Sequence, residues 1–308
     1  MRTWFKRLLV LGGVLVVLVL FVVLPVGGSF LITNLRVRPP DIASSDPGSL
    51  GLPVTPVEFT SEDGFGLKGW WSSGDPDRPV IIFVHGLNRS RLELLERAVE
   101  SHRKGYGVLL FDLRNHGESG RAFTTLGVQE SRDVCAAKAY VEEHVSDRPV
   151  ALWGVSLGAS TALLGSGRCR GFRAVIADSS FLSFEETVAH HFRLVFGLPS
   201  FPIANLLILT TRLRMGFDLA DGDVEAMVQA SPELPVLFIA GDQDVRMPPE
   251  LAERLYQASA HPDSDLLVVP GATHGRAFRQ DRSGYLGAVF AFLGKVFPEE
   301  ETLEPGPV

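Results

Sequence analysis

A short apolar run that leads into a G-x-S-x-G motif constrains this chain most. Residues 150–153 read Val-Ala-Leu-Trp, and Gly154, Ser156 and Gly158 follow before small residues that can begin a helix. A strand that reverses into a helix so quickly strains the backbone at the serine and needs glycines beside it. The motif therefore predicts a nucleophile elbow, with Ser156 as the nucleophile and the N–H of Leu157 pointing to the same space.

The rest of the chain must decide whether this motif is an elbow or a loop that merely favours Gly and Ser. Short, wholly apolar runs bounded by turn residues are typical of strands buried on both faces of a parallel sheet. Six such runs occur, at 80–84, 108–111, 150–153, 174–177, 236–239 and 266–269. Helical patterns occupy intervening segments such as 91–104, 128–144 and 250–258.

Two further strand-like runs precede this series. Residues 57–60 and 67–71 flank a Glu-Asp-Gly turn at 62–64, which predicts an antiparallel hairpin. Together with the six apolar runs, the pattern predicts an α/β fold with a doubly wound, mostly parallel sheet of eight strands. Functional residues should then lie in the loops that follow the carboxyl ends of the strands.

The N-terminus carries a long apolar segment. Residues 8–26 contain no charged side chain, and at about 1.5 Å per residue they span a bilayer core of about 30 Å. Arg2, Lys6 and Arg7 precede the segment, which predicts a cytoplasmic N-terminus and a catalytic domain outside the cytoplasm. The small residues at 26–29 leave a second interpretation, a cleaved signal peptide and a secreted domain. We expect residues 1–33 to form the anchor or signal and residues 34–53, which are rich in proline, to form a linker.

Composition narrows the range of partners. The net charge of −7 and the lack of a basic patch argue against a nucleic-acid partner. Residues 298–308 are acidic and proline-rich and predict a disordered tail.

Cys135 and Cys169 are the only cysteines; they could form a disulfide in an oxidising compartment or remain separate thiols. The sequence shows no pattern of metal ligands. The adjacent His190 and His191 would face different sides of a helix and so could not bind one metal ion together. We expect no metal or organic cofactor.

The first two loops after predicted strands offer supporting groups. In the first loop, a His-Gly turn at 85–86 leaves the N–H of Leu87 free to complete an oxyanion hole with Leu157, and His85 itself is expected to be structural. The second loop, 112–120, is strongly polar. Its His116 could act as a base, but we favour a self-bonded loop in which Asp112 and Arg114 pair.

Two later loops supply the other members of a triad. Asp242 and Asp244 both follow the strand at 236–239, and Asp178 ends an earlier strand. His274 lies in a Gly-rich turn after the last strand. A triad needs a buried carboxylate to orient the histidine that activates the serine, and Ser, Asp and His occur here in that order.

The chain resembles the α/β-hydrolase superfamily over roughly residues 54–297. The resemblance rests on five motifs in order, which are Val84-His85-Gly86, the loop 112–119, Gly154-Val155-Ser156-Leu157-Gly158, Gly241-Asp242-Gln243-Asp244 and Gly271-Ala272-Thr273-His274-Gly275. Within it, the chain looks like membrane-anchored bacterial relatives of the monoacylglycerol lipase, acyl-protein thioesterase and serine aminopeptidase branches. The resemblance implies that Asp244 is the triad acid, with Asp178 as the alternative.

The alternation of strands and helices breaks between residues 181 and 232. Two apolar helical stretches, 181–196 and 203–217, occur there, and an insertion at this place forms a lid over the serine in the family. The apolar surface favours an acyl-sized pocket, although the same residues could simply pack onto the core. A third interpretation is that residues 206–209 dip into the bilayer.

The prediction is a membrane-anchored serine hydrolase of carboxylic esters or thioesters with a short to medium acyl chain. Its site would be Ser156, His274 and Asp244, with the amides of Leu87 and Leu157 as the oxyanion hole. Two alternatives stay open. One is a serine aminopeptidase whose lid residues Glu185 and Glu186 bind a substrate ammonium group, and the other is a membrane-tethered binding protein without activity.

Overall fold

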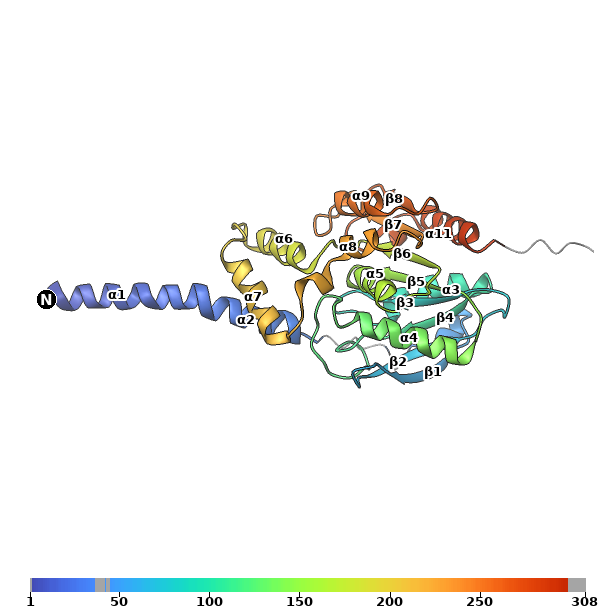
Figure 1. Ribbon diagram of the computed structural model, residues 1–308, viewed down its shortest axis with the longest axis horizontal. Coiled ribbons are helices and arrows are strands. Elements are labelled where there is room, and N and C mark those ends of the chain that lie inside the picture. The colour runs from blue at the N-terminus through green and yellow to red at the C-terminus, as the bar shows by residue number, and fades with distance from the viewer. Residues whose placement is uncertain (1, 37–41, 43–44, 299–308) are drawn as a thin grey trace, which may run out of the picture.

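A mixed sheet of eight strands forms the centre of the molecule (Figure 1). The computed structural model describes residues 2–36, 42 and 45–298. The strands are β1 (Thr55–Thr60), β2 (Gly66–Ser72), β3 (Val80–Val84), β4 (Gly107–Phe111), β5 (Val150–Val155), β6 (Ala174–Asp178), β7 (Val236–Gly241) and β8 (Asp265–Val269). Their order across the sheet is β1-β2-β4-β3-β5-β6-β7-β8. The hairpin β1–β2 is antiparallel and joins β4 in antiparallel register, whereas the strands from β4 to β8 are parallel to one another. The predicted fold class is confirmed.

Helices cover both faces of the sheet, so that its apolar strands are shielded from solvent. Every residue of β3, β4, β5, β6 and β7 is buried. One core layer lies between the sheet and the helices α4 (Ser131–His144), α5 (Leu157–Arg168), α8 (Val224–Gln229) and α9 (Pro249–Ala258). The opposite layer involves α3 (Leu95–Arg103), α10 (Ala277–Gln280) and α11 (Arg282–Val296). A chain with continuous hydrophobic strands needs such double coverage.

The predicted lid consists of two helices between β6 and α8. Helix α6 (Phe184–Phe196) is capped at its N-terminus by Ser183, whose hydroxyl accepts from the Glu186 amide at 3.2 Å. Helix α7 (Ile203–Met215) follows, and a short turn, η4 (Leu219–Gly222), leads back to the sheet. The lid buries Phe184 in the core but leaves Phe201 75% exposed, so it both packs onto the domain and presents an apolar outer edge.

The N-terminal helix is continuous and reaches the domain. Helix α1 (Arg2–Leu18), the π-helical turn η1 (Val19–Val23) and α2 (Leu24–Asn34) run on as one helix, and its part 3–34 is long and apolar enough to cross a membrane. Figure 1 shows α1 projecting from the domain and α2 lying beside α7. Within the predicted linker, residues 37–41 and 43–44 lie outside the described part, whereas Leu52 is fully buried in the core. The predicted tail also lies outside the described part, except for Pro298.

The two cysteines form a disulfide. Cys135 in α4 is bonded to Cys169, which directly follows α5, and their Cα atoms are 5.6 Å apart. The sequence left this pairing open because the two residues are 34 positions apart. The bond joins two neighbouring helices on one face of the sheet.

Reduction of the disulfide is expected to lower the free energy of unfolding by about 3–4 kcal/mol, because the bond closes a long loop in the unfolded chain. The measurement is urea unfolding of the full chain in detergent, followed by tryptophan fluorescence with and without reductant. The double variant Cys135→Ser/Cys169→Ser serves as control and should unfold at the lower midpoint under both conditions. Equal midpoints for the reduced and oxidised wild type would contradict a stabilising bond.

Candidate active site

The turn between β5 and α5 has the geometry of a nucleophile elbow. Ser156 lies between the two elements with φ 55° and ψ −120°, a conformation that is rare for a residue with a side chain. A Cβ on Gly154 would lie 2.2 Å from the carbonyl oxygen of Gly158, and one on Gly158 would lie 1.9 Å from that of Val84. Both glycines are therefore required by close backbone contacts, which is the physical reason for the G-x-S-x-G spacing.

Three predicted site residues come together at the carboxyl edge of the sheet. His274 Nε2 lies 2.8 Å from Ser156 Oγ, and His274 Nδ1 lies 2.7 Å from Asp244 Oδ2. Asp244 is buried, and its second oxygen, Oδ1, accepts from the amides of Arg246 and Met247 at 2.9 Å each. The carboxylate is thus held on one side by the backbone and faces the imidazole with the other.

The other two candidate acids point elsewhere. Asp178 Oδ2 accepts from the Tyr285 hydroxyl at 3.0 Å and lies 3.6 Å from the Arg97 guanidinium. Burial raises the pKa of Asp178, and the charge of Arg97 acts in the opposite direction. The backbone oxygen of Asp178 accepts from the Ser156 amide at 2.8 Å, so this residue braces the elbow. Asp242 Oδ1 accepts from the Gly271 amide at 2.6 Å and braces the turn before His274.

The predicted oxyanion-hole residues lie on the two segments that flank Ser156. Leu157 is the first residue of α5, where amides have no acceptor within the helix. On the facing loop, a Cβ at Gly86 would be 3.5 Å from Ser156 Cβ, so the segment that carries Leu87 approaches the serine closely. The Gly86 amide donates to Glu93 Oε2 at 2.7 Å, which fixes this loop, and burial raises the pKa of Glu93. The role of the Leu87 and Leu157 amides stays a prediction.

His85 is held as a neutral internal group. Its Nδ1 lies 2.8 Å from the Gly86 carbonyl oxygen, and its Nε2 accepts from the Leu113 amide at 3.0 Å. Burial lowers the pKa of His85 to about 3. His116 is also fully buried, with its Nδ1 2.8 Å from the Arg114 carbonyl oxygen, and its ring packs on that of His85. Both histidines join the first two loops together, in agreement with a structural role.

The predicted pair of Asp112 and Arg114 is wrong. Asp112 binds Arg91, with Nη2 2.7 Å from Oδ2, whereas Arg114 binds Asp133 and Asp63, each at 2.7 Å. The physical reason is that each ion pair is reinforced by a backbone contact: the Arg91 amide donates to Asp112 Oδ1 at 2.8 Å, and the Arg114 amide donates to Asp133 Oδ2 at 2.8 Å. The loop is self-bonded in other ways, since Asp112 Oδ2 also accepts from the Glu118 amide at 2.9 Å.

Sequence reasoning missed the buried cluster beneath the elbow. Arg97 packs its guanidinium over the ring of Phe278 at 4.4 Å and reaches Asp178 from α3, while Tyr285 reaches it from α11 and also accepts from Trp153 Nε1 at 3.2 Å. No local pattern marks these residues, because an arginine on an amphipathic helix is normally exposed. Only the packing of α3 and α11 on one face brings them together.

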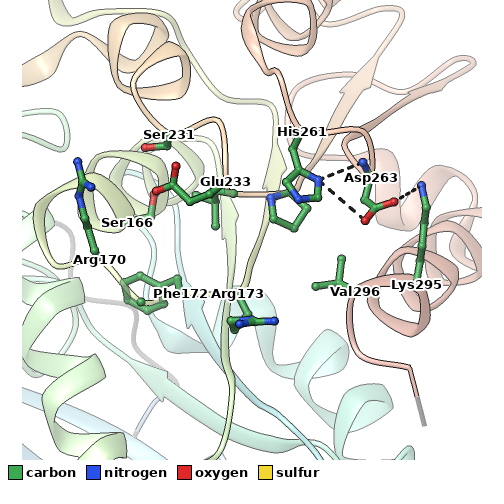
Figure 2. A pocket seen from close by; sticks show the side chains of 13 residues that line it. Ser166, Arg170, Phe172, Arg173, Ser231, Glu233, His261, Asp263, Lys295 and Val296 are labelled. Atoms are coloured by element: carbon green, nitrogen blue, oxygen red, sulfur yellow. Dashed lines mark hydrogen bonds and ion pairs between the residues drawn. The ribbon is translucent and has the colours of Figure 1, made fainter. Parts of the chain in front are cut away.

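A separate cleft of about 410 Å³ lies at the opposite edge of the sheet. Arg173, Pro235 and Asp263, at the amino ends of β6, β7 and β8, contribute to its lining. Figure 2 shows its polar wall, in which Asp263 bridges His261 and Lys295. Because Ser156, Asp244 and His274 follow the carboxyl ends of their strands, this cleft is not part of the candidate active site.

Comparison with known proteins agrees with this geometry. Residues 81–285 match the profile of the Alpha/beta hydrolase family. The chain belongs to this family. The Pyrococcus furiosus esterase Pf2001 is similar in structure, with a TM-score of 0.69 and 26% identity, over 85% of this chain and 98% of that one. The Bacillus subtilis protein YqkD is 30% identical over 78% of this chain and 79% of its own length. The Saccharomyces cerevisiae membrane protein YNL320W is 23% identical over 80% of this chain and 82% of its own length.

Proposed function

We propose that this alpha/beta hydrolase is a serine hydrolase that cleaves carboxylic esters or thioesters with a short to medium acyl chain. The observation that carries the proposal is the hydrogen-bonded path from Asp244 through His274 to Ser156, with contacts of 2.7 and 2.8 Å. Such a path lets a neutral imidazole take the serine proton as the hydroxyl attacks a carbonyl carbon. Similarity to the Pyrococcus furiosus esterase supports ester substrates.

The reaction would proceed in two acyl transfers. In the first, Ser156 Oγ bonds to the acyl carbon, His274 Nε2 receives the proton, and the Leu87 and Leu157 amides stabilise the negative oxygen of the tetrahedral intermediate. The imidazolium then protonates the leaving alcohol or thiol. In the second transfer water bonds to the acyl carbon and gives a proton to His274 Nε2. The bond from that carbon to Ser156 Oγ then breaks, the imidazolium returns the proton to Ser156, and the carboxylic acid leaves. Asp244 stabilises the imidazolium in both steps.

The aminopeptidase alternative has less support. Glu186 lies 3.5 Å from Arg254, which also binds Glu225, and Glu185 is exposed on the same helix. A carboxylate that is exposed and already paired is poorly suited to bind a substrate ammonium group. The strained, glycine-framed Ser156 is also difficult to account for in a binding protein without activity, because such strain persists where function requires it.

The location of the domain is part of the proposal. The N-terminal helix would anchor the chain, and the positive residues before it would keep the N-terminus in the cytoplasm. The disulfide supports the same orientation, since such bonds persist in oxidising compartments outside the cytoplasm.

The test is a comparison of substrates with the purified full chain. We expect p-nitrophenyl butyrate to be hydrolysed with a kcat/KM at least about 100-fold above that of alanine p-nitroanilide, because the two lid carboxylates, Glu185 and Glu186, are both exposed to water and would bind an ammonium group weakly. A fluorophosphonate probe should label one peptide, the one that contains Ser156. Faster cleavage of the anilide would favour the peptidase, and no labelling or turnover of any substrate would favour the binding protein.

A further inference from the structure

The end of the N-terminal helix is packed into the lid. Gly28 of α2 faces α7 so closely that a Cβ there would lie 2.8 Å from Leu207 Cδ1. The next residue, the buried Ser29, accepts at 2.9 Å from the hydroxyl of Thr211, which lies one turn after Leu207. Small and hydroxyl side chains therefore let α2 and α7 approach as two helices of one bundle.

Arg214 of α7 stabilises the contact between α2 and α7. Its Nη2 donates to the carbonyl oxygen of Ser29 at 2.9 Å and to the Thr33 hydroxyl. Its guanidinium also stacks on the ring of Phe30 at 4.0 Å and lies 5.5 Å from that of Phe123. One side chain thus binds the backbone, a hydroxyl and an aromatic face of the anchor helix.

The same helix end is bound to the loops beneath the lid. The Thr33 carbonyl oxygen accepts from the Thr124 amide at 2.8 Å. Arg36 donates to the carbonyl oxygens of Gly117 and Ser119 at 3.1 and 2.9 Å. The helix consequently leaves the domain in a fixed direction, and the domain cannot rotate freely about it.

The length of the apolar segment sets the depth of the lid. From Leu8 to Gly28 the helix rises about 30 Å, which is the thickness of a bilayer core. Helix α7 contacts η1 as well as α2, and Pro25, Ser29 and Thr33 of α2 are buried, so the lid packs against the domain-side end of the apolar segment, where the hydrocarbon gives way to the headgroups. Figure 1 shows α6 and α7 at the end of the domain from which the N-terminal helix extends.

The outer edge of the lid is apolar at this level. Its most exposed apolar residues are Val195, Phe196, Leu198, Phe201 and Leu213, each more than half exposed. Arg193 and Arg212 are exposed on the same two helices. Aromatic and aliphatic side chains next to arginines are typical of surfaces that lie in the headgroup region. The segment 206–209 is not part of this exposed edge, because Leu207 and Ile208 face inward.

We propose that the exposed edge of α6 and α7 lies in the bilayer interface and is held there by the contact of α7 with α2. A bilayer is the occupant that fits, because the edge is continuous with a helix that is long and apolar enough to cross a membrane and that the proposed function takes as the anchor. Helix α6 also reaches the triad loop, since His190 Nε2 lies 3.0 Å from the carbonyl oxygen of Val245, the neighbour of Asp244. The candidate site therefore takes esters dissolved in the membrane, a step that rests on the proposed function.

The docking is tested without reference to activity. Phe201→Trp is introduced into the full chain in phosphatidylcholine vesicles, and the fluorescence of the added tryptophan is quenched with brominated lipid. We expect quenching of at least half of the added signal. Tyr256→Trp is the matched control, because Tyr256 is an exposed aromatic residue on α9, and its signal should be quenched less than one tenth. Arg214→Ala in the Phe201→Trp background should reduce the quenching, and Arg214→Lys should reduce it less. Equal quenching at positions 201 and 256 would overturn the docking.

The source of the substrate is tested by a ratio of rates. Turnover of 4-methylumbelliferyl decanoate, a medium-chain ester dissolved in the vesicles, is divided by turnover of water-soluble p-nitrophenyl butyrate. The double variant Phe196→Asp/Phe201→Asp is expected to lower this ratio at least fivefold, and Tyr256→Asp to leave it unchanged. An unchanged ratio in the double variant would overturn delivery from the membrane. If neither ester is hydrolysed by the wild type, the proposed function fails, while the quenching result still decides the docking.

Discussion

Replacement of Ser156 with alanine is expected to lower kcat for p-nitrophenyl butyrate by about 10⁵-fold, or about 7 kcal/mol of transition-state stabilisation. Ser156 is the only hydroxyl within hydrogen-bond distance of His274 Nε2 in the described part of the chain, so no other group there can accept the acyl chain. Alanine keeps a Cβ and tolerates the elbow backbone about as well as serine. The thermal midpoint should therefore change little, because the lost hydroxyl contacts only the histidine.

Ser166→Ala provides the control for this measurement. Ser166 lies near the other end of the same helix, α5, ten positions after Ser156. Its hydroxyl donates to the Leu163 carbonyl oxygen at 2.7 Å. Its kcat should stay within twofold of the wild type. Retention of more than one hundredth of wild-type turnover in Ser156→Ala, with the fold intact, would place the nucleophile elsewhere.

The parts of the fold that sequence predicts are those with a strong local cause. Wholly apolar runs such as 80–84 and 150–153 have no other stable place than the middle of a covered sheet. The elbow is predictable for the same reason, because Gly154 and Gly158 are required by backbone contacts within a few residues. The position of His274 follows from strand order, since parallel strands end at one edge.

The parts that sequence does not predict depend on a choice among equivalent partners. Asp112 could pair with any nearby arginine, and only the folded position of the short helix η3 (Arg91–Leu94), which precedes α3, decides for Arg91 over Arg114. The docking of the anchor helix is similar. Composition predicts only that residues 1–33 form an anchor or signal, yet Ser29 and Thr33 bind Arg214, a partner more than 180 positions away. Nothing near residue 29 in the sequence indicates that contact.

The second large expected effect on kcat comes from replacement of the proposed triad acid, Asp244. Asp244→Asn is expected to lower kcat by about 10⁴-fold at neutral pH. Two backbone amides, from Arg246 and Met247, hold Oδ1, so the asparagine would keep its oxygen there and turn its NH₂ group toward His274 Nδ1. The imidazole would then accept at Nδ1 and carry its proton on Nε2. In that tautomer His274 cannot take the proton of Ser156.

Asp178→Asn and Asp242→Asn separate this effect from a general loss of acid groups. Asp178→Asn leaves the buried Arg97 without its carboxylate partner, so we expect a loss of about 3 kcal/mol in the free energy of unfolding and less than a tenfold change in kcat. Asp242→Asn retains the acceptor for the Gly271 amide and should change neither quantity appreciably. The measurements are kcat for p-nitrophenyl butyrate and urea unfolding of each variant. If kcat fell strongly in Asp178→Asn and stayed unchanged in Asp244→Asn, the triad acid would be Asp178 at the end of β6. The two measurements separate these outcomes, because the free energy of unfolding reports the Asp178–Arg97 pair and kcat reports the contact of the acid with His274.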